Sequence, residues 1–567
     1  MEGEPLLPIH NKPKTSKKKL LALIPLILLV GFIPHQKSAD LPTEQLCPIV
    51  DSYPPPAELY NADTLDKLLH DNDTKLKLAE KLSGAIKIPT EVYDDMINPK
   101  SVESNEELYQ LEPLWKNFEL FHDYLEKTYP LTHENLKLDK VNKFALVYTW
   151  EGSDTTKKPL MLTAHQDVVP VQKETIDRWD FPPFEGHIKD GEIYGRGVLD
   201  CKNLLTGLMD TVELLISEGF KPSRTLILAF GYDEESQGTG AEEISKFLLN
   251  KYGKDSMYQI IDEGGGGFVQ MGDLRMITPA TAEKGHLDSI IEIYTPGGHS
   301  SVPPEHTSIG ILSELIGLIE SKPFDSVITQ RNPVLSFYQC IAEHGDVDKS
   351  LKSDILNANV DKNANRRLLD VLRQDLKTKY LVTTSQAADI ISGGAKSNAL
   401  PEHAQVLVNQ RIAVEESVES ASTKILDDIK IIAKKYNLGI YINNKEIFPP
   451  TDFGYFNYTL SQPLEPAPVT PTDSDVWNVF GGSLRYFYQE LAYPEDNSTY
   501  IFAPYLSTGN TDTKCYWDLT PHIFRYMPAL LGESGGVHSV NERGSVDTHA
   551  AVVAFYYFYI PVIDSLQ

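Results

Sequence analysis

The chain has 567 residues, too many for one compact core, so two domains and additional segments are expected. Hydrophobic residues make up 41% and charged residues 23% of it, which is the composition of a folded globular protein. The formal net charge of −28 argues against nucleic acid or an anionic membrane surface as a binding partner.

The N-terminal segment predicts a membrane anchor. Lys17–Lys19 precede an uncharged, apolar stretch at 20–33, followed by Pro34. As a helix this stretch spans only about 21 Å, short of a ~30 Å hydrocarbon core, so a cleaved signal peptide is the alternative. The long polar leader and the lack of a prompt small-x-small cleavage site favour a retained anchor. Lysines before the span predict a cytosolic tail (1–19), an anchor (20–34) and a lumenal body after a stalk (35–60).

Short motifs suggest the compartment. Glu2 followed by Leu6-Leu7 fits the acidic dileucine pattern read by sorting adaptors, which predicts delivery to a vacuole or lysosome-like lumen as a single-pass type II protein. Three N-glycosylation sequons, at Asn72, Asn457 and Asn497, all follow the anchor, as expected of a lumenal body.

The body alternates strands and helices from about residue 61 to 284. Apolar strands at 144–150, 160–164, 225–231 and 260–261 are separated by amphipathic helices, two of them at 202–218 and 240–252. This α/β pattern predicts a mostly parallel sheet with both faces covered.

The pattern changes between residues 285 and 447. Strands at 287–294, 405–411 and 439–442 and helices at 308–319 and 418–436 predict an inserted α+β, ferredoxin-like domain. The polar helical segment 349–380 is interpreted as an elaboration of this insertion. Residues 448–567 are expected to return to the first domain, because that segment must deliver His538 to the site described next.

Candidate metal ligands occur where strands end or helices begin. They are His165 with Asp167, then Asp200, Glu234-Glu235, Asp262-Glu263 and His538. Open α/β sheets bind ligands at such positions. Alone, each has an ordinary explanation: a polar turn, a helix N-cap, a solvated acidic pair or a loop histidine. Together and in this order they predict a two-metal hydrolytic site.

The residue types suggest individual roles. His165 can bind a metal while Asp167 fixes its tautomer. The two oxygens of Asp200 can bridge two cations. In the adjacent pair Glu234-Glu235, one carboxylate can bind a metal while its neighbour acts as the general base.

Four motifs carry a family resemblance: Ala164-His-Gln-Asp-Val-Val-Pro170, Gly231-Tyr-Asp-Glu-Glu235, Gly297-Gly-His-Ser-Ser-Val-Pro303 and Gly509-Asn-Thr-Asp-Thr-Lys514. From about Thr64 to its end the chain resembles the zinc metallopeptidases that include aminoacylase, glutamate carboxypeptidase and the vacuolar Gly-Xaa carboxypeptidase S of fungi. The tail and anchor are most similar to the last of these.

The resemblance implies two Zn²⁺ per subunit and a set of ligands. His165 and Glu235 would bind separate ions, Asp200 would bridge them, and His538 would complete the second site. Glu234 would be the general base. Either Asp262 or Glu263 would complete the first, with Asp262 preferred. A cis peptide bond after Asp200 is also implied.

Substrate contacts are expected from the insertion, which would then serve as a lid and dimerisation domain. The resemblance implies that His299 donates to the developing oxyanion, often across a homodimer, and that Asn398 contacts substrate. Arg411 can grip a carboxylate with two parallel hydrogen bonds. Gly509 and Asn510 are expected near the pocket, although strand-end arginines and loop glycines have many structural uses.

Three functions follow as hypotheses. The first is a lumenal zinc carboxypeptidase acting on short peptides, with the Gly-Xaa preference implied by the resemblance. The second is an N-acyl-amino-acid hydrolase, which needs the same chemistry but an apolar acyl pocket. The third is a metal-free binding or sorting protein.

The four cysteines are too few and too scattered for a disulfide framework. Cys201 follows a candidate ligand and is expected to be buried and free. One disulfide among Cys47, Cys340 and Cys515 is compatible with the sequence.

Overall fold

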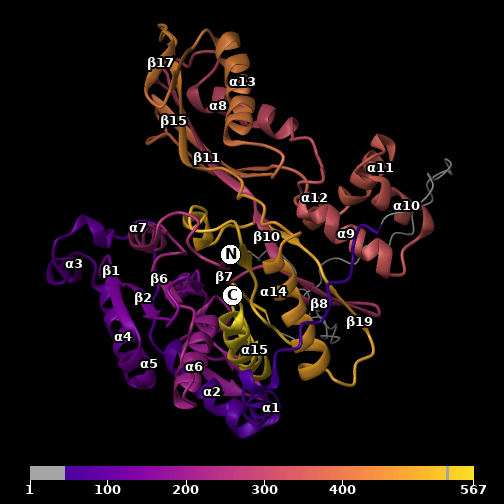
Figure 1. Ribbon diagram of the computed structural model, residues 1–567. Coiled ribbons are helices and arrows are strands. Elements are labelled where there is room, and N and C mark those ends of the chain that lie inside the picture. Colours follow the sequence, from indigo (N-terminus) through magenta and orange to yellow (C-terminus); the bar gives the residue numbers. More distant parts are fainter. Residues whose placement is uncertain (1–44, 532–534) are drawn as a thin grey trace, which may run out of the picture.

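The computed structural model describes residues 45–531 and 535–567; the expected tail and anchor and residues 35–44 of the expected stalk lie outside this range. The largest element is an eight-stranded sheet (Figure 1). Its strands, in spatial order, are β1 (Lys137–Val141), β2 (Ala145–Trp150), β6 (Leu226–Gly231), β3 (Leu160–His165), β7 (Gln259–Asp262), β21 (Ile523–Arg525), β10 (Ala280–Glu283) and β20 (Tyr505–Ser507).

The sheet is mixed, with a parallel centre. Strands β6, β3, β7 and β21 pair in parallel. Antiparallel pairing joins β1 to β2, β2 to β6 and β21 to β10. The α/β prediction is therefore confirmed, and the sheet is mixed, with parallel pairing at its centre and also between β10 and β20 at one edge.

Side chains alternate between two covered faces. In β3, Leu160 and Leu162 belong to one apolar cluster and Met161 to the other. The first cluster includes α6 (Lys202–Ser217) and α15 (Val546–Ser565), and the second includes α7 (Thr239–Tyr252). Burial on both faces explains why these strands are almost entirely apolar.

Helix α15 lies in the core against α6, α1 (Ala62–His70) and α2 (Asn72–Ile86). Within the described residues it is the one helix long and apolar enough to cross a membrane, and 89% of its most apolar window is buried in the protein. Its composition is therefore that of a core helix.

A second, six-stranded sheet projects from the first (Figure 1). Two helices, α8 (Ser308–Ser321) and α13 (Val418–Tyr436), pack on one of its faces. Its strands, in spatial order, are β13 (Ser385–Gly393), β15 (His403–Ile412), β11 (Gly285–Tyr294), β18 (Tyr455–Leu464), β16 (Gly439–Ile442) and β17 (Lys445–Phe448). Because β18 belongs to this sheet, the insertion extends to Leu464 and not to residue 447.

The helical segment after α8 differs from its prediction. It forms α9 (Pro333–His344), α10 (Lys349–Asn357), α11 (Lys362–Leu372) and α12 (Leu376–Lys379). Helices α9, α10 and α11 share an apolar cluster with Ala282 of β10 and Leu506 of β20. The segment therefore packs on the edge of the first sheet, because its apolar side chains contact apolar residues of β10 and β20.

The other α-helices and β-strands have the following bounds. They are α3 (Asn105–Leu111), α4 (Lys116–Thr128), α5 (Pro130–Asn135), α14 (Asp475–Tyr486), β4 (His187–Lys189), β5 (Glu192–Tyr194), β8 (Gly267–Met271), β9 (Leu274–Thr278), β12 (Gly298–His299), β14 (Ala399–Leu400), β19 (Thr499–Phe502) and β22 (Arg543–Ser545).

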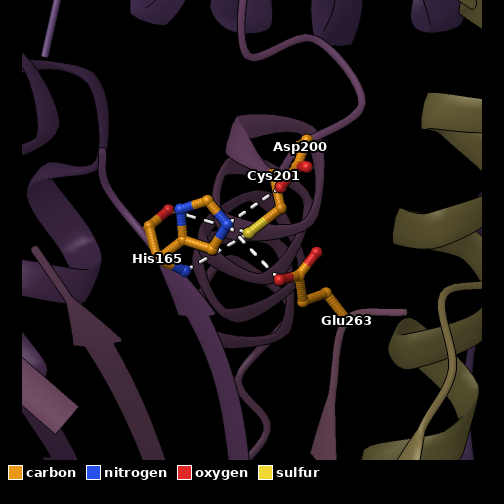
Figure 2. Close-up of side chains that lie close together, drawn as sticks. All are labelled: His165, Asp200, Cys201 and Glu263. Atoms are coloured by element: carbon orange, nitrogen blue, oxygen red, sulfur yellow. Dashed lines mark hydrogen bonds and ion pairs between the residues drawn. The ribbon is translucent and has the colours of Figure 1, made fainter. Parts of the chain in front are cut away.

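The chain crosses between the two sheets twice at one place. Strand β10 ends at Glu283 and β11 begins at Gly285, so Lys284 is the connecting residue. The return crossing lies beside it, where Ala467 N donates to Glu283 O at 3.0 Å. At the carboxyl ends of the central strands, polar side chains come together: His165 ends β3, Glu263 follows β7, and Asp200 precedes α6 (Figure 2).

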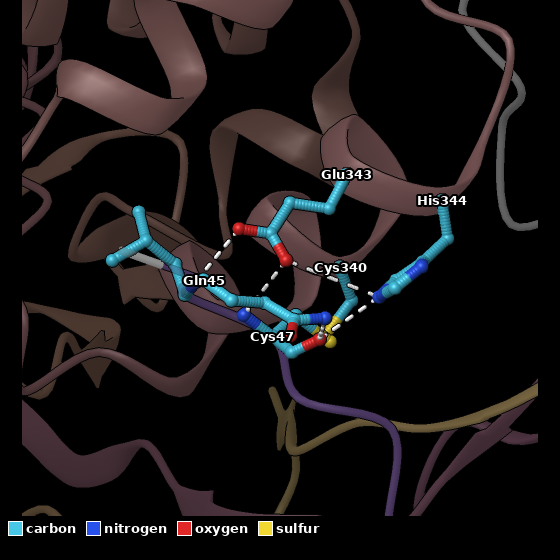
Figure 3. Close-up of a disulfide and its surroundings, with 6 residues drawn as sticks. Gln45, Cys47, Cys340, Glu343 and His344 are labelled. Carbon is cyan, nitrogen blue, oxygen red and sulfur yellow. Dashed lines mark hydrogen bonds and ion pairs between the residues drawn. A yellow bond between two sulfur atoms is a disulfide. The ribbon is translucent and has the colours of Figure 1, made fainter. Parts of the chain in front are cut away.

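A disulfide joins Cys47 to Cys340 of α9 (Figure 3). Glu343 accepts hydrogen bonds from the backbone N–H groups of Leu46 and Cys47, at 2.6 and 3.0 Å, and His344 Nε2 lies 2.8 Å from Cys47 O. The bond therefore fixes the start of the described chain to the helical segment, 293 residues away. Cys201 is buried and free, as predicted, and Cys515 is also free.

We expect Cys47→Ser to lower the free energy of unfolding by about 2–4 kcal/mol, because the disulfide closes a very long loop in the unfolded chain. Guanidinium unfolding followed by fluorescence measures this change. Cys515→Ser is the matched control and should leave the midpoint within error. Equal midpoints for the two variants would contradict a stabilising role for the disulfide.

Candidate active site

Candidate ligands from distant parts of the chain meet at one edge of the first sheet. His165 ends β3, Glu235 follows β6 and Glu263 follows β7, while Asp200 lies just before α6. His538 reaches them from the segment that precedes β22. The carboxyl ends of parallel strands thus supply the group, as predicted for an open sheet.

Asp200 lies between two imidazoles. His165 Nε2 is 3.0 Å from Asp200 Oδ1 and 3.4 Å from Glu263 Oε1 (Figure 2). His538 Nε2 is 3.0 Å from Asp200 Oδ2 and 2.9 Å from Glu235 Oε1. Each oxygen of one carboxylate therefore faces a different imidazole, which is the arrangement that a bridging ligand needs.

The donor atoms suit two metal ions. In each of the two groups, His165–Asp200–Glu263 and Asp200–Glu235–His538, the donor atoms lie within 4.8 Å of one another. Imidazole nitrogens and carboxylate oxygens are ligands that Zn²⁺ prefers. The residues present thus fit the metals that the sequence predicts.

The structure brings Glu263, and not Asp262, to His165. Asp262 ends β7 and is 1% exposed, and its Oδ1 accepts the N–H of Glu263 at 2.9 Å. Its Oδ2 is buried without a partner among the described residues. Of the two alternatives that the sequence left open, the geometry favours Glu263, because Asp262 faces the interior.

Cys201 also lies against this group (Figure 2). Its sulfur accepts the backbone N–H of His165 at 3.2 Å, and burial raises the pKa of the thiol well above its usual range. The Asp200–Cys201 peptide bond is cis, as the resemblance implied. We therefore interpret Cys201 as a protonated residue that packs against His165.

Asp167 contacts one residue from each group of metal ligands, His165 and Glu235. His165 Nδ1 lies 3.0 Å from Asp167 O and 3.4 Å from its Oδ1, while Asp167 Oδ2 accepts the N–H of Glu235 at 2.9 Å. With Nδ1 facing these acceptors, His165 donates from Nδ1 and presents the Nε2 lone pair to the site. This geometry agrees with the orienting role predicted for Asp167.

A buried ion pair holds the loop that carries Asp200. Glu542 is fully buried and lies 2.6 Å from Arg196 Nη1. It also accepts the backbone N–H groups of Gly197 and Leu199 at 3.0 and 2.9 Å. Both charged residues stand in the sequence motifs of the site, Arg196 between two glycines and Glu542 four positions after His538, but no role was predicted for either.

The site holds an excess of buried negative charge. Burial, with nearby Asp200, raises the pKa of Glu263 to about 8, and burial raises the pKa of Glu235. Hydrogen bonds to Asp200 and Glu235 raise the pKa of His538 to about 10. Crowded, desolvated carboxylates are stabilised by cations, so the electrostatics also favour metal binding.

Arg411 and Asn510 meet at the crossing between the two sheets. Arg411 lies near the end of β15, and its Nη1 donates to Asn510 Oδ1 at 3.0 Å. Gly509 is exposed, and a Cβ built on it would meet no atom within 4 Å. Three predicted substrate-binding residues, Arg411, Gly509 and Asn510, therefore lie together, and Gly509 is exposed to solvent.

His299 and Asn398 lie elsewhere, at the far end of the second sheet. His299 pairs with Ala399, and Ser300 N donates to Asn398 O at 3.3 Å. Strand β15 runs from His403 on that side to Arg411 at the crossing, about 27 Å along the strand. Both side chains are exposed, and this chain does not bring them to its own metal ligands.

The three sequons differ in access. Asn72 and Asn497 are exposed. Asn457 is 5% exposed, and its amide nitrogen lies 2.9 Å from Glu292 Oε2 and 3.2 Å from Asn444 Oδ1. The folded chain therefore does not present Asn457 for glycosylation, because its side chain is part of the second sheet's packing.

The fold and this ligand set match a known family. Residues 161–561 match Peptidase family M20/M25/M40. The chain belongs to this family. Carboxypeptidase S of Saccharomyces cerevisiae is 42% identical over 505 residues, covering 88% of this chain and 86% of that protein. The predicted family resemblance is confirmed.

Two further similar proteins differ in what their names describe. The N-fatty-acyl-amino acid synthase/hydrolase PM20D1 of Homo sapiens is 30% identical, covering 87% of this chain and 89% of that protein. A solved structure of the di-peptidase Dug1p from Saccharomyces cerevisiae has a TM-score of 0.60 at 16% identity, covering 89% of this chain and 100% of that chain. The last comparison supports the shared fold.

We expect metal binding to release protons at neutral pH. With a pKa of about 8, Glu263 is mostly protonated there, and with a pKa of about 10, His538 is an imidazolium ion. Both must lose a proton to act as ligands, so metal affinity should fall as the pH falls. Calorimetric titration of the metal-free protein with zinc, in buffers of different ionisation enthalpy, counts the protons released.

Glu263→Gln provides the comparison, since it removes one titrating ligand. It should release fewer protons and bind the metal more weakly. A heat of binding independent of the buffer would contradict the assignment.

Proposed function

We propose that this M20 family member is a di-zinc carboxypeptidase that removes the C-terminal residue of short peptides. The observation that carries the proposal is the Asp200 carboxylate, whose two oxygens face the imidazoles of His165 and His538. The extensive similarity to carboxypeptidase S supports the removal of a C-terminal residue. The proposed preference for a Gly-Xaa bond rests on the motif resemblance alone.

The metal ligands follow from the contacts of the site. His165, Asp200 and Glu263 would hold one zinc, and Asp200, Glu235 and His538 the other. Two zinc ions bound there would lower the pKa of water and polarise the carbonyl of the scissile bond. Asp167 would keep His165 in the tautomer that binds metal.

Glu234 is the proposed general base. It follows β6 beside Glu235 and belongs to a group with His165, but it is not needed in either three-ligand set. Its carboxylate would take a proton from the attacking water and transfer it to the leaving amine nitrogen. Two adjacent glutamates thus divide the tasks of metal ligand and proton carrier.

Arg411 is the proposed site for the substrate's C-terminal carboxylate. A guanidinium has five N–H donors, and Arg411 uses one of these on Asn510. The others can form two parallel hydrogen bonds with a carboxylate. Burial lowers the pKa of Arg411, while the negative charges of Asp288 and Glu234 oppose that shift.

His299 is proposed to act on the site of a partner subunit. Its position at the far end of the second sheet favours donation to the oxyanion in trans within a homodimer. Edge strand β13 supports such an interface, because Ile390 and Ile391 are 56% and 59% exposed and β13 pairs with β15 alone among the described strands. The second sheet would then serve as lid and dimerisation surface.

The proposed location is a vacuolar or lysosome-like lumen. The Cys47–Cys340 disulfide supports an oxidising compartment for the body. The membrane anchor, the type II orientation and the sorting role of Leu6-Leu7 rest on the sequence of the N-terminal 44 residues. Glycosylation is proposed at Asn72 and Asn497.

The purified protein should hydrolyse a blocked Gly-Leu dipeptide faster than N-oleoyl-leucine, as followed by release of leucine. Glu234→Gln should keep both zinc ions, measured by mass spectrometry of bound metal, while turnover falls by at least about 10²–10⁴-fold through loss of the proton carrier. The exposed substitution Glu242→Gln is the matched control and should leave turnover unchanged.

Faster cleavage of N-oleoyl-leucine would favour the N-acyl-amino-acid hydrolase. Appreciable turnover by Glu234→Gln would contradict its role as the base. Protein that holds less than one zinc per chain and cleaves neither substrate would favour a binding or sorting protein.

Mixing two inactive variants tests the role of His299 in trans. His299→Ala and Glu234→Gln should each lose turnover, yet their mixture should regain about a quarter of wild-type activity after subunit exchange, because a mixed dimer has one competent site. Size-exclusion chromatography with light scattering verifies the dimer. A mixture that stays inactive despite exchange would contradict donation in trans.

A further inference from the structure

Asn510 joins the substrate-gripping arginine to the connection between the two sheets. Its Oδ1 accepts from Arg411 Nη1 at 3.0 Å, and its Nδ2 donates to Lys284 O at 2.7 Å. Arg411 lies on the second sheet and Asn510 on a loop after β20 of the first, while Lys284 connects the two. One carboxamide therefore contacts both sheets and their connection.

The chemistry of its neighbours fixes the orientation of this carboxamide. A guanidinium can only donate and a backbone carbonyl can only accept, so reversing the amide would break both hydrogen bonds. The amide nitrogen, which a substrate carboxylate would need as a donor, faces Lys284 O. This arrangement favours Asn510 as a support for Arg411 over Asn510 as a direct ligand of substrate.

The loop that carries Asn510 is held by a buried network. Thr511 and Thr513 donate from their hydroxyls to the two carboxylate oxygens of Glu283, at 2.9 and 3.1 Å. Arg525 Nη2 lies 3.0 Å from Glu283 Oε2, and both charged side chains are at most 1% exposed. Since Glu283 immediately precedes Lys284, the same network fixes Asn510 and its acceptor.

Hydrogen bonds also hold Lys284 and Arg411, the two partners of Asn510. Lys284 Nζ donates to the backbone oxygens of Tyr380 and Thr383, at 3.2 and 2.7 Å. Arg411 N donates to Ser385 Oγ at 3.2 Å, at the start of β13. With its backbone fixed, the freedom left to Arg411 is that of its long side chain, and the bond to Asn510 limits that freedom.

We infer that Asn510 is a positioning residue, which aims the guanidinium of Arg411 at the substrate's C-terminal carboxylate and sets it relative to the connection between the sheets. The inference rests on the proposed function, in which Arg411 binds that carboxylate. Arg411 without this support would sample more rotamers, and each substrate bound would have to order it again.

The experiment compares Asn510→Ala, Arg411→Ala and the double variant on a blocked Gly-Leu dipeptide and on the same dipeptide with its C-terminal carboxylate amidated. Asn510→Ala should raise KM for the free carboxylate about tenfold, the typical effect of losing a hydrogen bond to a charged group, with kcat changed less than about twofold. The amidated dipeptide should show no such penalty. In the Arg411→Ala background, Asn510→Ala should have no further effect.

Asn510→Asp is a second, isosteric variant that best preserves the fold. It keeps an acceptor for Arg411, loses the donor to Lys284 O and places a negative charge against the guanidinium. It should therefore raise KM for the free carboxylate more than Asn510→Ala does. Asn365→Ala is the control, because the amide of Asn365 in α11 also donates to two backbone oxygens, those of Ile328 and Ala358, both at 3.0 Å.

The outcomes separate the two levels of the proposal. If Arg411→Ala affects both dipeptides equally, the carboxylate grip in the proposed function is wrong. If Arg411→Ala affects only the free carboxylate but Asn510→Ala adds a full, independent penalty to it, Asn510 acts without Arg411 and the inference is overturned. Equal losses on both dipeptides from Asn510→Ala, with the control unchanged, would also overturn it.

Discussion

The placement of one carboxylate constrains most of this molecule. Asp200 must hold its two oxygens toward His165 and His538, which lie 3.0 Å away on either side and come from opposite ends of the body. The chain can satisfy this only if it returns to the first sheet after the insertion. The ion pair between Glu542 and Arg196 reinforces the same geometry, because it fastens the Asp200 loop to the segment that carries His538.

Much of this arrangement could be predicted from the sequence, since strand ends and ligand types are local features. The choice between Asp262 and Glu263 could not, because side chains alternate in direction along a strand and a strand's last residue is uncertain by one position. The structure ends β7 at Asp262, so Asp262 keeps the inward direction and Glu263 turns to the site. A shift of one residue in a predicted boundary would exchange the two.

Other features depend on contacts between distant segments. Pairing Cys47 with Cys340 requires knowing that α9 lies beside the start of the body, and the polar pattern of 349–380 does not reveal which sheet those helices pack against. Helix contacts with Ala282 and Leu506 decide the second point. Similarly, β18 follows the predicted insertion in sequence, yet its pairing with β11 makes it a central strand of the second sheet.

The two ends of the second sheet carry residues with different proposed roles. Arg411, at the crossing, lies near this chain's own base, whereas His299 is about a strand length away. A rigid sheet cannot present both residues to one metal pair, so the distance itself favours a second copy as the recipient of His299. The same sheet would then link substrate binding in one subunit to oxyanion stabilisation in the other.

Charge explains why the cationic side of the site must be held so firmly. The substrate's carboxylate approaches a protein of net charge −28 and a pocket of raised carboxyl pKa values. Bound metal ions would offset much of that charge, but they would act on the scissile bond and not on the chain terminus. In the proposed function the terminus depends on Arg411, and Glu234 would compete with the substrate's carboxylate for a guanidinium that was free to turn toward it. The carboxamide of Asn510 provides a neutral acceptor, so it can restrain the guanidinium without neutralising it.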